Sequence, residues 1–422
     1  MIKRKTLRRT KIVATLGPAS FDSKILERMI EAGVDVVRIN FSHGTKDEHI
    51  EITELTRSLA RSAGHSVGVL ADLQGPKIRI GKFENGSITL KTGDQFVLDT
   101  NCDLGNEERV GLDYKELPND VESGVILMLD DGHIVLSVSE VKGGKVYCTV
   151  EHGGKLSNNK GINRKGGGLS SAPALTSKDI EDIKTAAAFK ADYLAVSFPR
   201  SGEDINKARE LMRNAGGKSL LMAKIERTEA ISALDDILQA SDAIMVARGD
   251  LSVEVGDAAV PALQKKMIRT ARNRNKLVVT ATQMMESMVA SPIPTRAEVS
   301  DVANAVLDGT DAVMLSSESA SGLYPVEAVE AMARVCLEAE KEYLVNLDLR
   351  RMQGGMPDTI EEAIARATMF TAGGLKISAI AALTQSGLTA LLMSRKSSNV
   401  PIFALSPQVS TRRKMTLFRG VY

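Results

Sequence analysis

Short apolar runs alternate with stretches of helical period along most of the chain. In the first part, each run is long enough for one buried strand, and the apolar residues between runs recur every three or four positions, which is typical of amphipathic helices. The first helix is expected to begin at Ser20 or Asp22 and to end at Gly33. Buried strands are predicted at 10–16, 36–41 and 67–73.

The pattern changes between residues 76 and 172, where helical period is nearly absent. Short β-rich segments are separated there by turn signals such as Asn85-Gly86 and Asp131-Gly132, which favour hairpins. The segments are predicted at 87–90, 95–98, 125–129, 134–138 and 145–150. We therefore expect a separate all-β domain that is inserted into the first one.

The alternation of strands and helices resumes at Ser177. Five more buried strands are predicted, at 193–198, 219–225, 243–247, 277–282 and 311–315, and a helix from 324 to about 344 follows them. Together with the three strands before the insert they make eight parallel βα units, which favours a closed (β/α)8 barrel. A doubly wound open sheet is the alternative.

A third α/β region follows a polar, glycine-rich link at 350–358. Helices are predicted at 359–375, 387–397 and 407–414, and strands at 378–383 and 402–405. Because so few strands make a thin sheet, we do not expect this region to fold alone. The predicted fold class is α/β: a (β/α)8 TIM barrel at 1–75 and 173–345, an inserted all-β lid domain at 76–172, and a C-terminal α/β regulatory domain at 358–422 that is incomplete in this chain.

Composition and charge argue against several classes of protein. Lys plus Arg is 54 and Asp plus Glu is 53, so the net charge is +1, which gives no electrostatic case for binding nucleic acid or an anionic membrane. No apolar run approaches the roughly 18 residues of a membrane span, and the basic N-terminus lacks the apolar segment of a signal peptide. Three cysteines without CxxC spacing argue against a disulfide framework or a zinc–thiolate site. A cytoplasmic protein is expected.

Polar residues follow the predicted strands at their C-terminal ends, where barrels of this type carry their chemistry. Taken singly, such a residue is more often a helix cap or a surface ion pair. Glu226 and Asp250 follow adjacent strands, however, and can ligate one hard cation such as Mg²⁺. Lys224 shares a strand face with Glu226 and suits phosphate or enolate charge, and Arg38 adds a second cation.

Two other kinds of active site find no support in the sequence. A P-loop would need a glycine five positions before Gly217-Lys218-Ser219, and Met212 stands there. A Cys/His pair or a nucleophile elbow is not visible either.

At these residues the sequence resembles the pyruvate kinase family, in order from Arg9 to Tyr422. The resemblance implies a barrel, a lid and a C-terminal α/β domain, usually in a homotetramer. It also implies a reaction that moves the phosphoryl group of phosphoenolpyruvate to ADP, giving pyruvate and ATP. The motifs that carry it are RINFSHG at 38–44, DLQGPKIR at 72–79, MAKIE at 222–226, MVARGD at 245–250, ATQMMES at 281–287, NAVLDGTDAVML at 304–315 and the Ser-Glu at 317–318.

The resemblance assigns roles to the residues around the substrate. Glu226 and Asp250 would hold Mg²⁺ or Mn²⁺, Lys224 would stabilise the phosphoryl group in transfer and the enolate left behind, and Arg38 would bind the phosphate. The substrate carboxylate would be held by the backbone amides of Gly249 and Asp250 and by the Thr282 hydroxyl. Ser316 and Glu318 lie in the region of the family's proton relay. The nucleotide-side positions are Asn40, His43, Arg79 and Lys160.

The resemblance also implies a K⁺ site at Asn40, Ser42, Asp72 and the Leu73 carbonyl. In family members that depend on K⁺, the position of Lys77 is typically Glu, and relatives with Lys there typically do not need K⁺. An ammonium group can supply the same charge without an ion. The sequence therefore predicts a K⁺ site that activity does not require. A solvated hinge lysine is the alternative.

The resemblance also implies an effector site, in a C-terminal region that departs from the family. Thr384, Ser386, Gly387 and Thr389 resemble a loop that binds an effector phosphate, of a sugar phosphate or AMP, at a helix start. Many relatives have Arg where Leu388 stands, which predicts a weak site, and an ordinary helix N-cap is the alternative.

The same residues argue against three rival functions. An aldolase or lyase on a similar barrel would not need a lid carrying Lys160 or the nucleotide-side Arg79. A dikinase would need a phosphohistidine segment, and the five histidines lie in no such context. A binding protein without activity would be expected to have lost Lys224 or a metal carboxylate.

Overall fold

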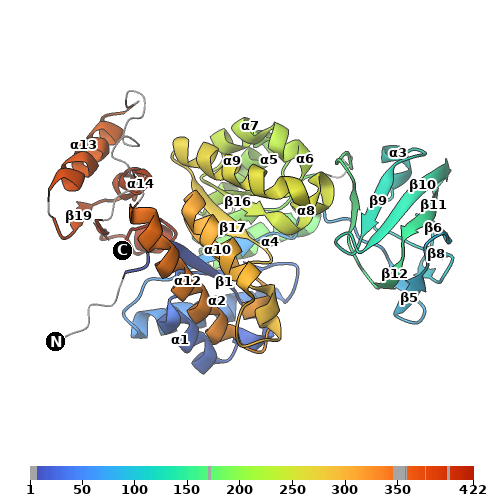
Figure 1. The fold of residues 1–422 in the computed structure, drawn as a ribbon, viewed down its shortest axis with the longest axis horizontal. Coiled ribbons are helices and arrows are strands. Elements are labelled where there is room, and N and C mark those ends of the chain that lie inside the picture. The colour runs from blue at the N-terminus through green and yellow to red at the C-terminus, as the bar shows by residue number, and fades with distance from the viewer. Residues whose placement is uncertain (1–6, 170–172, 346–356, 358, 376, 397–399) are drawn as a thin grey trace.

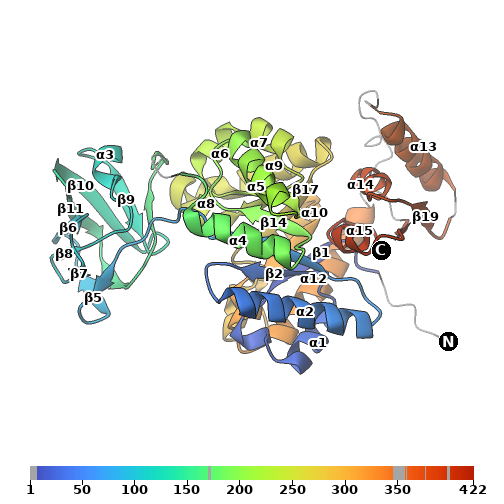
Figure 2. The same ribbon diagram turned by 180° about the vertical axis from the view of Figure 1, so that it is seen from behind.

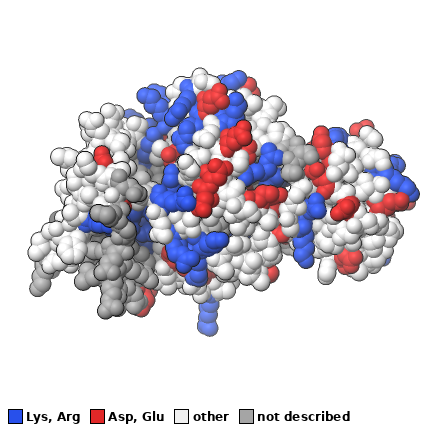
Figure 3. Space-filling view, turned by 90° about the horizontal axis from the view of Figure 1, so that it is seen from above, with Lys and Arg blue, Asp and Glu red and all other residues white. Residues whose placement is uncertain are grey.

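The protein is described by a computed structural model that covers residues 7–169, 173–345, 357, 359–375, 377–396 and 400–422 (Figure 1). Apart from Pro357, the predicted link at 350–358 lies outside the described residues, and so does the end of the helix predicted to 397. No helix among the described residues is long and apolar enough to span a bilayer. Lys and Arg side chains intermingle with Asp and Glu on the face in Figure 3.

Eight parallel strands close into a barrel, in the order β1-β18-β17-β16-β15-β14-β3-β2. The closing pair is β1 with β18, in which Lys11 lies opposite Ala312. The barrel fold is therefore confirmed, and the open sheet is wrong. The strands are β1 Lys11–Thr15, β2 Val36–Asn40, β3 Gly68–Asp72, β14 Tyr193–Val196, β15 Leu220–Ile225, β16 Ala243–Ala247, β17 Leu277–Ala281 and β18 Ala312–Leu315.

Helices surround the barrel, and their ends follow local sequence signals. Asp22 caps α1, because its side chain accepts the backbone N–H groups of Lys24 and Ile25, whereas Ser20 ends a separate 3-10 turn. Gly33 ends α1 with a φ of 120°. The helices are α1 Ser23–Ala32, α2 Lys46–Ser62, α4 Ser177–Ala188, α5 Gly202–Asn214, α6 Thr228–Ser232, α7 Leu234–Ala240, α8 Arg248–Val255, α9 Val260–Asn273, α10 Arg296–Asp308, α11 Ser317–Ala320 and α12 Pro325–Val345.

The barrel wall separates two apolar cores, because its strands are buried on both faces. Outward-facing residues such as Ile12 and Leu194 pack against the ring of helices. Inward-facing residues such as Val13, Leu70 and Met245 fill the interior. The polar residues at the strand ends therefore stand on a rigid, fully packed base.

The segment between β3 and α4 forms an all-β body beside the barrel (Figures 1 and 2). Its main sheet has the order β13-β9-β10-β11-β6-β8, and it has an apolar core of its own. Its elements are β4 Lys82–Phe83, β5 Ser87–Leu90, β6 Gln95–Asp99, β7 Leu104–Gly105, β8 Arg109–Val110, α3 Leu117–Asp120, β9 Ile126–Leu129, β10 Ile134–Lys142, β11 Lys145–His152, β12 Gly154–Ser157 and β13 Ile162–Arg164.

The C-terminal region lies on the other side of the barrel from the all-β body (Figure 1). Leu417, Phe418 and Val421 belong to the same apolar core as the barrel interior, so this region completes the floor of the barrel. Among the described residues, its sheet consists of β19 and β20 only. Its elements are α13 Ile360–Gly374, β19 Ile380–Leu383, α14 Leu388–Arg395, β20 Ile402–Leu405 and α15 Val409–Met415.

Candidate functional site

The candidate site lies at the C-terminal ends of the barrel strands, beside the all-β body. The parallel register places Asn40 opposite Asp72, and Lys224 opposite Met245. Asp72 ends β3, and the chain then leaves the barrel for the all-β body through residues 73–81. The strand ends and this connection therefore meet at one mouth.

Asp72 is the buried centre of a charge cluster. Its Oδ2 accepts a hydrogen bond from Arg38 Nε at 2.6 Å, and its Oδ1 lies at ion-pair distance, 3.4 Å, from Lys224 Nζ. Burial alone would raise the pKa of Asp72, but Lys224 and Arg38 outweigh this effect and lower it. Among the described residues no hydrogen bond of good geometry reaches Oδ1, so this buried oxygen has only the ion-pair contact with Lys224.

Lys224 joins two carboxylates. Its Nζ lies 2.9 Å from Glu226 Oε1 and donates a hydrogen bond to Ser197 Oγ at 2.7 Å. Burial would lower the pKa of Lys224, but the charges of Asp72 and Glu226 outweigh burial and raise it. Lys224 is therefore a fixed ammonium ion with little freedom to move.

Glu226 and Asp250 are the two candidate metal ligands, and they influence each other electrostatically. Burial raises the pKa of Glu226, Lys224 lowers it, and the negative charge of Asp250 raises it further. Among the described residues, no group of three or more His, Cys, Asp or Glu converges on a possible ion. Two repelling carboxylates fit a hard cation such as Mg²⁺ that takes its remaining ligands from substrate and water.

The end of β17 is a strained turn. Thr282 has a φ of 68° and Gln283 a φ of 52°, a conformation that is costly for a β-branched residue. Arg248 holds the turn, because it donates to the Thr282 carbonyl at 2.7 Å and pairs with Asp301 at 2.7 Å. The turn aims the Thr282 hydroxyl at α8, where it accepts the Gly249 N–H at 2.8 Å. Gly249 and Thr282 thus lie together, as the sequence predicts.

Glu318 lies behind the mouth. It is fully buried, and its two oxygens accept backbone N–H groups, from Ser316 at 2.7 Å and from Met285 at 3.1 Å. The carboxylate therefore connects the loops that follow β17 and β18. Ser316 itself is partly exposed at the end of β18.

The predicted nucleotide-side residues are spread over the mouth and the all-β body. Asn40 and His43 lie at and just after the end of β2, and His43 is exposed. Arg79 and Lys160 lie outside the named strands, on two segments that pair with each other through the Arg79–Gly161 bridge and the Ile80 N–H to Lys160 carbonyl hydrogen bond. Their side chains reach different partners: Arg79 donates to the Asn159 carbonyl at 3.2 Å, and Lys160 pairs with Asp130 at 2.7 Å.

The oxygen atoms of the predicted K⁺ site have other partners in the structure. Asn40 Oδ1 accepts the Ser42 N–H at 3.1 Å, and the Leu73 carbonyl accepts the Ser197 hydroxyl at 2.7 Å. Asp72 faces Arg38 and Lys224, as described above. The donor set is rich in oxygen, as K⁺ requires, and the buried Oδ1 of Asp72 is compatible with a cation there.

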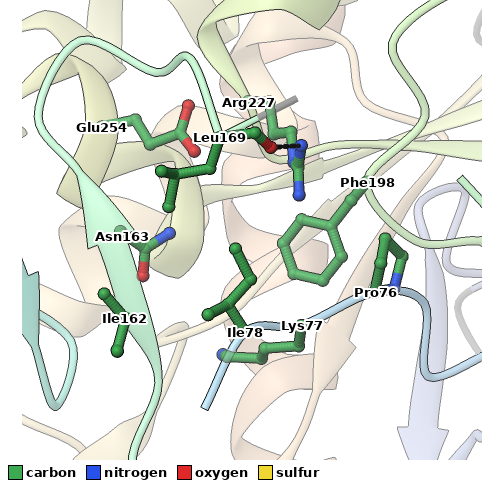
Figure 4. A pocket seen from close by; sticks show the side chains of 9 residues that line it. All are labelled: Pro76, Lys77, Ile78, Ile162, Asn163, Leu169, Phe198, Arg227 and Glu254. Atoms are coloured by element: carbon green, nitrogen blue, oxygen red, sulfur yellow. Dashed lines mark hydrogen bonds between the residues drawn. The ribbon is translucent and has the colours of Figure 1, made fainter. Parts of the chain in front are cut away.

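A small pocket lies where the all-β body joins the barrel (Figure 4). Glu254 of α8 forms one wall, and burial raises its pKa to about 7. Arg227 donates to the Leu169 carbonyl at 3.0 Å, and its guanidinium lies over the Phe198 ring. The residues around the pocket are Pro76, Lys77, Ile78, Ile162, Asn163, Leu169, Phe198, Arg227 and Glu254.

The predicted effector loop is remote from the mouth. Thr384 Oγ1 accepts the Gly387 N–H at 2.9 Å, and Ser386 Oγ accepts the Leu388 N–H at 3.3 Å, so both hydroxyls serve the start of α14. Leu388 is 46% exposed and supplies no charge. Thr389 lies in the first turn of α14.

Three residues that shape the site were not among those predicted from the sequence. Ser197 links Lys224 to the Leu73 carbonyl, and Arg248 holds the Thr282 turn. Glu254 borders the pocket at the junction. Ser197 could have been found by reading the end of the fourth predicted strand as the other strand ends were read. The other two depend on how α8 packs, which no local pattern reveals.

Comparison with known proteins agrees with this geometry. Residues 7–329 match the family model for the barrel domain of pyruvate kinase, and residues 362–422 match that for its alpha/beta domain. Pyruvate kinase II of Salmonella typhimurium is 56% identical over 98% of this chain and 87% of its own length. A pyruvate kinase of Haemophilus influenzae is 55% identical over 98% and 88%.

A solved structure extends the likeness to three dimensions. The crystal structure of a pyruvate kinase from Cryptosporidium parvum covers 98% of this chain and 86% of its own, with a TM-score of 0.91 and 35% identity. The family models span the barrel and the C-terminal region, and the relatives match almost the whole chain. The chain belongs to the pyruvate kinase family.

Proposed function

We propose that the cluster at the barrel mouth performs the reaction of this family, the transfer of the phosphoryl group from phosphoenolpyruvate to ADP, which gives pyruvate and ATP. The observation that carries the proposal is Lys224, which is buried as an ammonium ion between Asp72 and Glu226 and near Arg38. Phosphoryl transfer needs positioning and charge stabilisation more than covalent chemistry. A fixed cationic group beside a carboxylate pair supplies both.

Glu226 and Asp250 are the residues that would hold Mg²⁺, and Mn²⁺ would suit the same oxygen ligands. When bound, the metal neutralises charge on the transferring phosphoryl group and on the enolate oxygen. Arg38 binds the phosphate, and its Nε is oriented by Asp72. Lys224 stabilises the phosphoryl group in transfer and the enolate that it leaves.

The substrate carboxylate is held by the start of α8 and the turn after β17. The amides of Gly249 and Asp250 and the Thr282 hydroxyl would donate to it. The Gly249 N–H now donates to Thr282, so binding exchanges this hydrogen bond for one to substrate. The enolate carbon finally takes a proton from the region of Ser316, where Glu318 acts as a positioning residue because it holds the backbone of both loops.

The nucleotide is bound between the mouth and residues 76–172, which act as the lid on the barrel at 1–75 and 173–345. Asn40, His43, Arg79 and Lys160 take its phosphates. Lys160 must leave Asp130 to do so. Lys160→Met should raise the KM for ADP more than that for phosphoenolpyruvate, while Lys155→Met, at an exposed position of the same body, should change neither.

A K⁺ ion would take oxygen ligands from Asn40, Ser42, Asp72 and the Leu73 carbonyl, but Lys77 makes the ion dispensable. The protein also self-associates, as a homotetramer. The C-terminal domain at 358–422 is regulatory, and a sugar phosphate or AMP binds only weakly at Thr384–Thr389, because Leu388 supplies no cation.

A coupled assay with phosphoenolpyruvate and ADP tests the main proposal. Pyruvate formed in the presence of Mg²⁺ is reduced by lactate dehydrogenase, and the loss of NADH absorbance is followed. We expect turnover that requires phosphoenolpyruvate, ADP and the divalent metal together. Pyruvate formation that does not depend on ADP would contradict the proposal.

A further inference from the structure

Lys77 reaches from the connection between the two bodies to a proposed metal ligand. Its Nζ donates a hydrogen bond to Asp250 Oδ1 at 2.8 Å. The two side chains are 25% and 18% exposed, so the ion pair is mostly shielded from water. Asp250 belongs to α8 of the barrel, and Lys77 lies on the connection between β3 of the barrel and β4 of the all-β body.

We call the two segments that connect the barrel and the all-β body, residues 73–81 and 160–169, the hinge, and Lys77 lies in the first of them. The outgoing and returning segments are joined by two backbone hydrogen bonds, from Ile162 N to Ile78 O and from Ile80 N to Lys160 O, both at 2.9 Å. A Cβ added at Gly161 would lie 3.1 Å from Lys77 Cε, so the side chain runs along the returning segment. Figure 4 shows Lys77 extended beside Ile78 at the edge of the junction pocket.

The position of this ammonium group conflicts with that of a metal ion. A divalent cation bound by Glu226 and Asp250 would stand close to the oxygen that Lys77 now holds, and like charges at such a separation repel strongly where water is scarce. The ammonium and the metal also compete for the same lone pairs. The structure therefore indicates that the Lys77 ammonium group and a divalent metal ion are alternative partners of the Asp250 carboxylate.

We propose that Lys77 is the resident cation of the metal site, which neutralises Asp250 while no divalent metal is bound and leaves when the metal arrives. Because Lys77 is fixed to the hinge, its departure releases the lid connection from the barrel. Metal occupancy and hinge position are therefore linked, and the link acts in both directions. This inference rests on the proposed function, since it takes Glu226 and Asp250 as the metal ligands.

Direct binding of Mn²⁺ to the full chain, without substrates, tests the competition. Free Mn²⁺ is measured by its electron paramagnetic resonance signal in a buffer without K⁺ and at constant ionic strength. Removing the competing charge in Lys77→Met should tighten Mn²⁺ binding by about tenfold, the scale of one partly shielded charge interaction. Lys77→Arg keeps the charge and should bind Mn²⁺ as the unmodified protein does, and so should Lys82→Met, at an exposed position of the lid.

Hydrogen exchange of the hinge amides tests the link to the lid. In the unmodified protein, saturating Mn²⁺ should speed exchange at Gly166, whose N–H donates to the Glu254 carbonyl of α8 at 2.9 Å and so joins the returning segment to the barrel. It should not do so at Ile80 and Ile162, whose hydrogen bonds lie within the all-β body. In Lys77→Met, exchange at Gly166 should be fast already without metal and should not change on its addition. If Lys77→Met binds Mn²⁺ more tightly but shows the same hydrogen exchange as the unmodified protein, Lys77 acts on the metal by charge repulsion alone. That result would refute the link between metal binding and the hinge.

Glu226→Gln separates the inference from the proposed function. If this variant binds Mn²⁺ as tightly as the unmodified protein, the proposed metal site is wrong. If it loses binding while Lys77→Met binds Mn²⁺ with unchanged affinity, the metal site stands and the role of Lys77 is refuted.

Discussion

The two ends of the barrel both bury charge, but they use it differently. At the floor, the carboxylate of Asp311 accepts hydrogen bonds from both terminal guanidinium nitrogens of Arg395, with Nη1 at 2.9 Å, and also from the Val278 N–H. At the mouth, Asp72 and Glu226 share the single ammonium of Lys224. At the floor, one carboxylate has a cation and hydrogen-bond donors of its own. At the mouth, two carboxylates share one cation.

The pKa values reflect this difference. Burial would raise the pKa of Asp311, but Arg395 outweighs burial and lowers it. Burial also raises the pKa of Glu226, and there the opposing effect of Lys224 is insufficient. Charge at the floor therefore fixes the C-terminal region to the barrel, and charge at the mouth remains available to substrate and metal, in line with the usual division of labour in this fold.

Asp311→Asn gives the largest effect that the comparison predicts. It leaves Arg395, which is nearly inaccessible, without a counter-charge, and breaking such a buried pair typically costs about 3–5 kcal/mol of stability. We expect a large fall in the urea midpoint and little change in kcat for the molecules that remain folded. The control is Glu338→Gln, in a surface pair with Lys341, which should cost at most about 1 kcal/mol. Equal losses in both variants would contradict the special role of the floor.

Lys224→Met should have the opposite effect to Asp311→Asn, with a large loss of kcat and a smaller loss of stability. Losing one preorganised stabiliser should lower kcat by about 10²–10³, with a smaller change in KM. Stability should fall less than it does for Asp311→Asn, because Asp72 keeps Arg38 and because Glu226, whose pKa burial already raises, can take up a proton when Lys224 is removed. Steady-state kinetics and a urea titration of the same sample measure both quantities. A kcat like that of the unmodified protein would refute the role of Lys224 at the mouth.

Glu254→Gln is predicted to act on the pH dependence of stability. Its pKa is about 7 when folded and near 4.5 when unfolded, so the folded state binds the proton more tightly. Stability is then lost as pH rises from about 4.5 through 7, at up to about 1.4 kcal/mol per pH unit. Gln carries no charge and can still accept the Thr228 N–H. The variant should therefore gain thermal stability over the unmodified protein at pH 8.5 and not at pH 5, and an equal difference at both pH values would exclude this role.

The K⁺ response is the smallest predicted effect in the unmodified protein. Lys77 already supplies a positive charge near the mouth, so activity with Mg²⁺ should be substantial without K⁺ or NH₄⁺ and should change little when K⁺ is added. In Lys77→Glu, basal activity should fall and K⁺ should restore it. A tetraalkylammonium salt keeps the ionic strength constant between assays. An absolute K⁺ requirement in the unmodified protein would show that Lys77 does not replace the ion.

Much of the barrel could be predicted because its signals are local. The strand at 243–247 was predicted with the bounds of β16, since five consecutive apolar residues can only be buried together. The shared strand face of Lys224 and Glu226 follows from the two-residue period, and the structure has the two side chains 2.9 Å apart.

The rest depends on contacts between distant segments. Lys77 and Asp250 are 173 positions apart, and nothing near Lys77 in the sequence specifies that its partner lies on α8. The docking of the C-terminal region was also missed, because Arg395 and Asp311 belong to different elements and are 84 positions apart. The sequence predicted a sheet of two strands in the C-terminal region. It did not predict that the apolar core of this region is continuous with that of the barrel interior.

The floor of the barrel has a consequence for synthesis on the ribosome. Lys11 Nζ donates to the Val421 carbonyl, 410 positions away, and the Gly420 N–H donates to the Arg9 carbonyl, so the two ends of the described chain close the structure together. A nascent chain cannot make these contacts until nearly all of the 422 residues have left the exit tunnel. The all-β body, whose core is its own, can be complete long before that. The floor contacts of the barrel can therefore form only after the all-β body has had time to fold.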